Sequence, residues 1–176
     1  MATKKELFIN SIELVELEGR TNVPTVIYYG NGKCHIGYDA FDASSSPDQI
    51  NENFKLELGA HDVSVINRRQ FEIATGETRS AHALTKDFVE EAIKHVFART
   101  EARLLRRAER VLVAEPIAMG ETETTRSSWL TNYRAHLRRI LESKFGEVDF
   151  LPEPFAVFQY YRYGIRHPLV AGQARH

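Results

Sequence analysis

The second half of the chain alternates between segments with the hydrophobic period of a helix and short strand-like segments. Apolar residues recur at helical spacing from about residue 85 to 107, and again in the stretch that ends at Gly146. The segment RVLVAEP is typical of a buried strand and EVDFLP of a further strand, while PFAVFQYYRYG is typical of a helix. This order favours parallel pairing of the two strands across a right-handed crossover. Residues 84–164 therefore predict helices and parallel strands in alternation.

Most of these elements carry start or stop signals of their own. Thr85 can cap the first helix, and Pro116 should stop the first strand. Gly146 should end the second helix, as a glycine often does. Pro154 suits the first turn of the last helix, and Gly164 suits its end.

The first half, over 7–80, is rich in strand signals. IELVELEG, VPTVIYYG and KCHIGYDA are short apolar segments, and the GNG at 30–32 predicts a tight turn of a β-meander. DASSSPDQIN reads as a loop with a short helix at Pro47, and NFKLELG and QFEIATGETRS read as further strands with a turn at ATGE. With 176 residues, we expect one domain or lobe of α/β (mixed α+β) class, followed by a tail over 165–176.

Composition excludes several classes of function. The net charge is −1, so no overall field attracts nucleic acid or anionic lipid, and the arginines at 99–139 are interleaved with glutamates. Apolar runs are too short for a membrane span, so neither a nucleic-acid nor a membrane partner is expected. The single cysteine, Cys34, forms no disulfide within the chain, which fits a cytoplasmic protein. Cys34 and His35 point to opposite faces of a strand, so no metal site is expected there.

The order of elements resembles a known family. The run ALTKDFVEEAIKHVFARTEARLL, the strand RVLVAEP, an amphipathic helix ending in glycine, and VDFLPEPFAVFQYYRYG are similar to the nucleotide-binding domain of DnaK-type seventy-kilodalton heat-shock chaperones, in the actin-like ATPase superfamily. EGRTNVPTVIYYGNGKCHIGYDA and NFKLELG in the first half resemble the same domain. The resemblance implies a parent activity of ATP binding and hydrolysis with Mg²⁺.

Two glycine-rich phosphate loops hold the nucleotide in that family, and neither loop occurs in these 176 residues. We therefore expect the chain to be a partial actin-like ATPase lobe that lies between the two loops. ATP and Mg²⁺ would bind only with those segments present, because backbone amides of such loops cradle the phosphates. For this chain alone no cofactor and no metal is expected.

The resemblance assigns roles to four residues. Glu153 would help to position the attacking water, and Lys55 would face the γ-phosphate, where a cation offsets developing charge. Pro116 and Arg126 would relay the state of the nucleotide, although Arg126 lies further from Pro116 than in the family. Simpler interpretations stay open: Glu153 as a carboxylate at a helix N-terminus, Lys55 as a solvated lysine on an edge strand, and Pro116 as a strand stop.

Aromatic residues crowd the last two helices. Their spacing indicates core packing, but the run Phe158–Tyr161 covers more than one helix face, which predicts an exposed apolar surface that could bind a protein partner or a second copy. The alternative function is a non-enzymatic interaction module that keeps part of the fold. An unrelated small α/β enzyme would need a cluster of polar residues that the sequence does not show.

Overall fold

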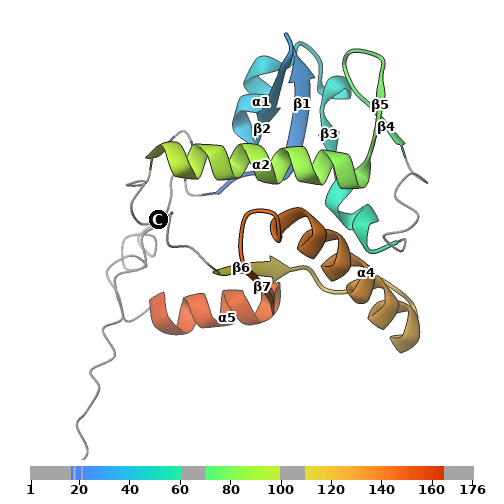
Figure 1. The fold of residues 1–176 in the computed structure, drawn as a ribbon, viewed down its shortest axis with the longest axis vertical. Coiled ribbons are helices and arrows are strands. Elements are labelled where there is room, and N and C mark those ends of the chain that lie inside the picture. Colours follow the sequence, from blue (N-terminus) through green and yellow to red (C-terminus); the bar gives the residue numbers. More distant parts are fainter. Residues whose placement is uncertain (1–16, 18, 21, 61–69, 100–109, 165–176) are drawn as a thin grey trace, which may run out of the picture.

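A computed structural model describes residues 17, 19–20, 22–60, 70–99 and 110–164 (Figure 1). These residues form helices and small sheets, so the class is mixed α/β. A group of short strands and helix α1 lies above the long helix α2, and β6, β7, α4 and α5 lie below it (Figure 1). Most of the first predicted strand, residues 61–69 between NFKLELG and QFEIATGETRS, and the tail over 165–176 lie outside the described residues.

The first sheet is antiparallel with strand order β2-β1-β3. Its strands are β1 (Val26–Gly30), β2 (Lys33–Ile36) and β3 (Asn51–Glu52). The predicted turn is confirmed: Asn31 and Gly32 have φ of 52° and 70°, the left-handed pair that a two-residue hairpin needs. Helix α1 (Tyr38–Ala43) follows, and the short helix at Pro47 is the 3₁₀ helix η1 (Pro47–Gln49).

The segment NFKLELG is not a strand, which corrects the prediction. It forms the 3₁₀ helix η2 (Phe54–Leu58). Asn53 adopts a left-handed φ of 59° and so ends the extended backbone of β3 immediately before it. Phe54 and Leu58 are then fully buried, at 0% and 1% exposure, and they belong to different hydrophobic clusters. Lys55 therefore lies on a helical turn and not on a strand edge.

A second hairpin leads directly into the long helix. Strands β4 (Gln70–Glu72) and β5 (Thr78–Ser80) pair antiparallel around the predicted ATGE turn, where Gly76 has a φ of 81°. Helix α2 (Ala81–Arg99) starts four residues earlier than predicted, because Ser80 accepts a hydrogen bond from the backbone N–H of Ala83 at 3.2 Å. Thr85 is not a cap: it is buried within the helix and donates to the carbonyl of Ala81 at 2.8 Å.

The predicted alternation of helices and strands is confirmed in the second half. Strand β6 (Arg110–Glu115), helix α4 (Glu123–Leu141), strand β7 (Glu147–Pro152) and helix α5 (Glu153–Gly164) follow in that order. β6 and β7 pair in parallel. α4 ends at Leu141 and not at Gly146, because the N–H groups of Lys144 and Phe145 both turn back to the carbonyl of Leu141.

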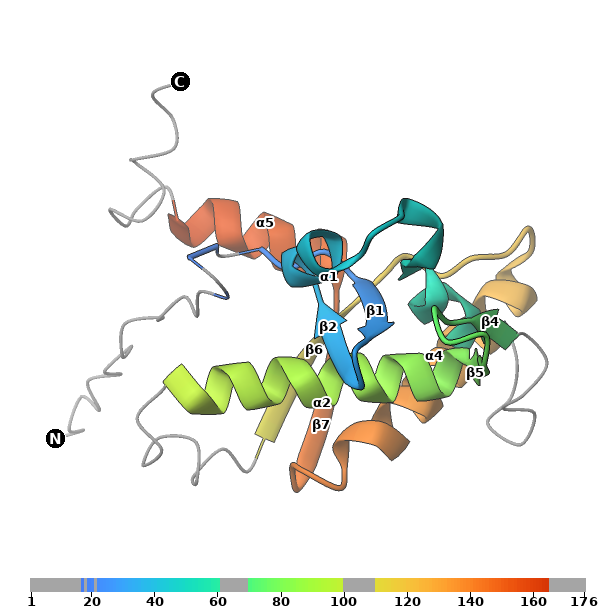
Figure 2. The ribbon, with the colours of Figure 1, turned by 90° about the horizontal axis from the view of Figure 1, so that it is seen from above.

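Two hydrophobic clusters meet at α2. One stripe of the helix, Leu84, Phe88 and Ala92, packs into the cluster beneath the first sheet. The adjacent stripe, Ala81, Val89 and Ile93, packs into the cluster of α4, β6 and β7. Seen from above, β6 and β7 run across α2 (Figure 2). The long helix therefore connects the two parts of the fold.

The parallel pair is not the fully buried sheet that its sequence predicts. Val111 and Val113 of β6 pack into the second cluster, but Leu112, which lies between them, is 59% exposed. Helix α5 packs against both strands from the side opposite α2 (Figure 1) and still leaves this face partly open. In the described residues no helix combines the length and the apolar character needed to cross a membrane.

Candidate functional site at the carboxyl end of the parallel strands

The carboxyl ends of β6 and β7 bring together residues that are far apart in the sequence. Glu115, the last residue of β6, pairs in register with Pro152, the last residue of β7. Pro116 follows directly after β6, and Glu153 directly after β7 as the first residue of α5. In open α/β sheets, ligand sites form at this edge, where the strands end and loops and helix N-termini begin.

Glu115 is the residue at this edge that sequence reasoning missed. Its side chain is 1% exposed, and it accepts two hydrogen bonds from Arg134 of α4, at 2.7 Å from Nε and 2.6 Å from Nη2. These bonds raise the pKa of Arg134 above its ordinary value. Such a two-pronged pair neutralises a charge that could not be buried alone. The signal in the sequence was a glutamate that continues the apolar run RVLVA without a break.

Tyr133 of α4 is a buried tyrosine whose pKa is affected by both carboxylates of the edge. The ring is 3% exposed and stacks on Trp129, with ring centroids 5.1 Å apart and planes 13° from parallel. Burial raises the pKa of Tyr133, and the nearby charges of Glu153 and Glu115 raise it further. The phenol therefore stays protonated at neutral pH.

The two predicted catalytic residues lie on different elements. Glu153 is half-buried at the N-terminus of α5, where the helix dipole stabilises a carboxylate by about 0.3–1 kcal/mol. Lys55 is half-buried in the last turn of η2, which packs against α2 and α4. No hydrogen bond or ion pair joins Lys55 to Glu153 in the described part of the chain. The structure thus places Glu153 at the edge of the β6–β7 pair. Lys55 lies on η2, beside α2 and α4, and has no hydrogen bond or ion pair with Glu153 among the described residues.

The two predicted relay residues are also apart. Pro116 is half-buried at the end of β6 and immediately follows the buried ion pair. Arg126 is exposed in the first turn of α4, where its N–H donates to the carbonyl of Thr122 at 3.0 Å. Pro116 therefore lies at the candidate site, and Arg126 lies at the far end of the loop that connects β6 to α4.

The chemistry available at this edge is that of a water- and cation-binding carboxylate. Glu153 can accept hydrogen bonds from water and attract a hydrated cation, the interactions that Mg²⁺ sites use. Glu115 is already engaged by Arg134, so it is suited to fixing the end of β6 and not to binding a ligand. Among the described residues, no group of three His, Cys, Asp or Glu side chains is arranged to hold a metal ion by itself.

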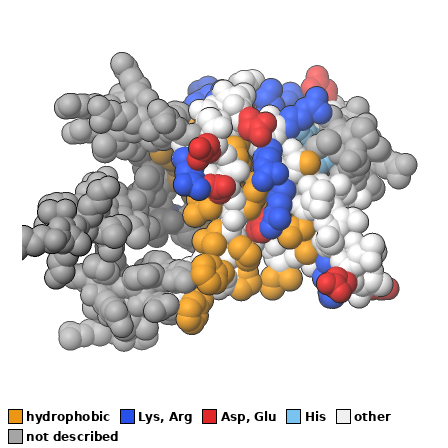
Figure 3. Space-filling model, turned by 60° about the horizontal axis from the view of Figure 1, so that its bottom comes forward, with side chains coloured by type: hydrophobic (Ala, Val, Ile, Leu, Met, Phe, Trp, Pro, Cys, Tyr) orange, Lys and Arg blue, Asp and Glu red, His pale blue; other side chains and the backbone are white. Residues whose placement is uncertain are grey.

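An exposed apolar surface lies beside the edge. Three of its residues are on α5, Phe155, Val157 and Phe158, with exposures of 50%, 53% and 58%, and Leu112 and Ile117 lie on and after β6. Figure 3 turns the α5 side of the molecule forward and shows hydrophobic side chains gathered there. Trp129 and Tyr133 are core residues, as their spacing predicts, whereas the side chains of 159–164 lie outside the described set.

Comparison with known proteins adds no family to this geometry. No protein-family model matches the chain, and no curated protein matches it significantly.

Proposed function

We propose that the chain is part of an ATP-binding and ATP-hydrolysing domain of the actin-like, heat-shock-chaperone kind. The observation that carries the proposal is the position of Glu153. It follows a parallel strand at the carboxyl edge of the β6–β7 pair and opens the helix that ends in Tyr163-Gly164. The alternation α2-β6-α4-β7-α5 and the sequence motifs within these elements support the same proposal.

In this proposal each of the four predicted site residues has one task. Glu153 accepts hydrogen bonds from the attacking water and from the water shell of Mg²⁺. Lys55 supplies positive charge towards the terminal phosphate from η2. Pro116 and Arg126, at the two ends of the β6–α4 loop, transmit the state of the nucleotide. The Glu115–Arg134 pair anchors the start of that loop.

A chimera tests the catalytic role directly. Residues 22–164 replace the corresponding segment between the two phosphate loops of a heat-shock-chaperone nucleotide-binding domain. We expect the chimera to bind Mg-ATP in calorimetry and to hydrolyse it. Glu153→Gln should lower turnover by at least about tenfold and leave ATP affinity within about threefold, because the carboxylate acts on the water and not on the nucleotide. Glu142→Gln, an exposed carboxylate immediately after α4, is the matched control.

The isolated chain provides the second arm. Residues 1–176 contain neither phosphate loop, so we expect calorimetry to show weak binding or none with Mg-ATP. Stoichiometric micromolar binding would contradict this expectation. A folded chimera that binds ATP but is unaffected by Glu153→Gln would contradict the proposed role of Glu153, and one that fails to bind ATP would contradict the proposed domain.

The exposed apolar surface favours a second candidate, an interaction module that binds another copy of this chain. Phe155, Val157 and Phe158 of α5 each expose about half of their area. Exposed apolar side chains that gather on one element mark an interaction site. We expect concentration-dependent self-association in analytical ultracentrifugation. Phe155→Ser combined with Phe158→Ser should abolish it, and Phe41→Ser, an exposed phenylalanine on α1, should not. A chain that stays monomeric at high concentration would contradict this candidate.

A further inference from the structure

A pocket of about 350 Å³ lies on the other side of the molecule from α5, between the ends of the two hairpins and one face of α2. The β1–β2 turn contributes Gly30 and Lys33, and the β4–β5 turn contributes Thr75 and Glu77. Helix α2 forms the remaining wall. The volume of the pocket is at the lower end of the range for small-molecule sites. The pocket does not include any residue of the β6–β7 edge, so it is a separate site.

The floor of this pocket is apolar and its position is fixed. Tyr29, Cys34 and Ile73 line it, and all three belong to or pack against the first hydrophobic cluster. The Tyr29 hydroxyl donates to Asp87 Oδ2 at 2.7 Å, and Arg79 Nη1 donates to the same oxygen at 2.8 Å. The Arg79 guanidinium also lies 4.7 Å from the centre of the Tyr29 ring. These contacts order the pocket without a ligand.

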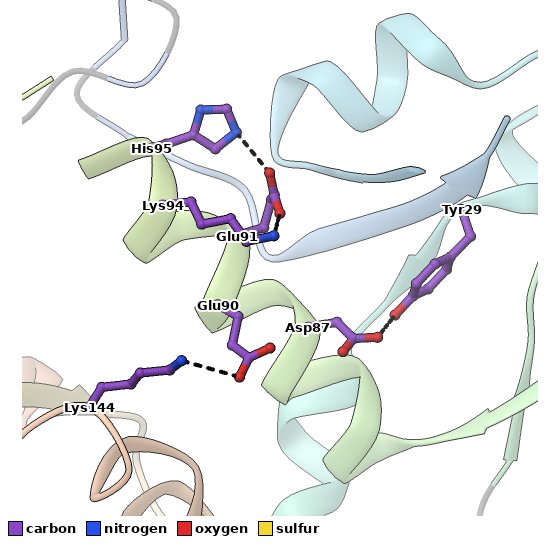
Figure 4. A network of polar contacts seen from close by, with 7 residues as sticks. All are labelled: Tyr29, Asp87, Glu90, Glu91, Lys94, His95 and Lys144. Atoms are coloured by element: carbon purple, nitrogen blue, oxygen red, sulfur yellow. Dashed lines mark hydrogen bonds and ion pairs between the residues drawn. The ribbon is translucent and has the colours of Figure 1, made fainter. Parts of the chain in front are cut away.

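The α2 wall presents three carboxylates on one helix face. Asp87, Glu90 and Glu91 stand three and four residues apart on α2 and all three line the pocket. Figure 4 shows the Asp87 carboxylate turned towards Tyr29 and the Glu90 carboxylate turned towards Lys144. Glu91 is engaged by Lys94 at 2.6 Å. Glu90 forms an ion pair with Lys144 at 3.7 Å, which is longer than a hydrogen bond, so its oxygens can still accept hydrogen bonds from a ligand.

Two groups on the floor, Cys34 and Tyr29, lie near the carboxylates of α2. Burial raises the pKa of the Cys34 thiol to about 12, and the carboxylates of Asp87 and Glu91 raise it more than Lys94 and Arg79 lower it. Burial likewise raises the pKa of Tyr29, and Asp87 contributes more to this than Arg79 opposes it. The lining as a whole holds four carboxylates (Glu77, Asp87, Glu90 and Glu91) and three cationic side chains (Lys33, Arg79 and Lys94), so carboxylates are in slight excess.

We propose that this pocket binds a small organic cation, an alkyl ammonium or guanidinium compound, whose apolar part rests on Tyr29, Cys34 and Ile73 while its charged group meets Glu90 and the free oxygen of Asp87. The apolar floor distinguishes such a ligand from a bare metal ion, which would gain nothing from it. The size of the pocket suits a ligand with a short carbon chain.

The test uses agmatine, which carries a guanidinium and an ammonium group on a four-carbon chain, and butyrate as an anion of similar length. Calorimetry on the chain 1–176 should show one-to-one binding of agmatine and none of butyrate. Backbone amide NMR shifts should change at Gly30, Lys33 and Glu90 on addition of agmatine. Rising salt should weaken binding, because the interaction is between opposite charges.

Variants that remove charge and keep shape locate the site. Glu90→Gln and Asp87→Asn should each weaken agmatine binding by at least about fivefold, because each removes one negative charge beside the ligand. Glu142→Gln, outside the pocket, should leave it unchanged. Asp87→Asn can also disturb the hydrogen bonds of Asp87 with Tyr29 and Arg79, so Glu90→Gln is the decisive variant. Absence of binding at millimolar agmatine, equal binding of butyrate, displacement of agmatine by Mg²⁺ alone, or indifference to Glu90→Gln would each overturn the proposal.

Discussion

Removal of Arg134 should be one of the most damaging single changes to the fold. Glu115 is 1% exposed, and Arg134 supplies its two short hydrogen bonds. Arg134→Ala leaves a carboxylate buried without a counter-charge, which costs about 3–5 kcal/mol. We expect the lower end of that range, because the Arg134 side chain is 38% exposed and water can reach the vacated space. The loss is a large part of a typical stability of about 5–15 kcal/mol.

The same argument predicts the response of the double variant. Glu115→Leu combined with Arg134→Leu should be within about 1 kcal/mol of the wild-type chain, because apolar residues replace a buried pair with little net cost.

Urea denaturation followed by circular dichroism measures all of these free energies. Arg139→Ala, an exposed arginine on the same helix, is the control and should change the free energy of unfolding by less than about 0.5 kcal/mol. A loss below about 1 kcal/mol for Arg134→Ala, or a double variant as unstable as the single one, would refute the reasoning.

Three further predictions concern other parts of the chain. His82 and His136 face each other with Nδ1 atoms 3.0 Å apart; burial lowers the pKa of His82, and His136, Arg139 and Lys86 lower it further. The contribution of His82 to the free energy of unfolding is thus present above about pH 6.5 and is lost as pH falls through the lowered folded-state pKa. His82→Gln should therefore flatten the fall in the urea midpoint between pH 7 and 5. An equal slope in both proteins would contradict this. A Cβ at Gly59 would overlap the indole ring of Trp129, so Gly59→Ala should lower the free energy of unfolding by more than about 2 kcal/mol. The added methyl group of Gly32→Ala meets no atom, so this control should cost about 1 kcal/mol, for the positive φ alone. Equal losses would argue against the packing of Trp129 on Gly59. Burial raises the pKa of Cys34 to about 12, so this single thiol should react with a disulfide reagent at pH 8 much more slowly in the native chain than in urea; equal rates would contradict its burial.

Local signals predicted the second half of the fold well. The parallel pairing of β6 and β7 follows from apolar strands separated by an amphipathic helix, and Pro154 lies in the first turn of α5 as expected. Helix ends were less predictable. Thr85 is a good cap residue, but Ser80 comes first at the end of β5 and caps the helix there.

Prediction from the sequence failed mainly where contacts between distant segments determine the local structure. The segment FKLEL alternates like a strand, but it becomes a 3₁₀ helix because Asn53 turns the backbone and Phe54 and Leu58 fill separate clusters. At the candidate site, Glu153 could be placed from the order of elements. Glu115 could not, because only the position of Arg134 on α4 shows that a buried glutamate there is neutralised.

The two adjacent stripes of α2 have a consequence for how the molecule unfolds. Leu84, Phe88 and Ala92 belong to one cluster, and Val89 and Ile93 to the other, so neither cluster can lose α2 without exposing the helix surface that the other one buries. Opening of one half therefore raises the free energy of the other. The central turns of α2 should be the last to exchange their amide hydrogens, with a protection that matches global unfolding. A single helix thus joins two small hydrophobic clusters into one cooperative unit.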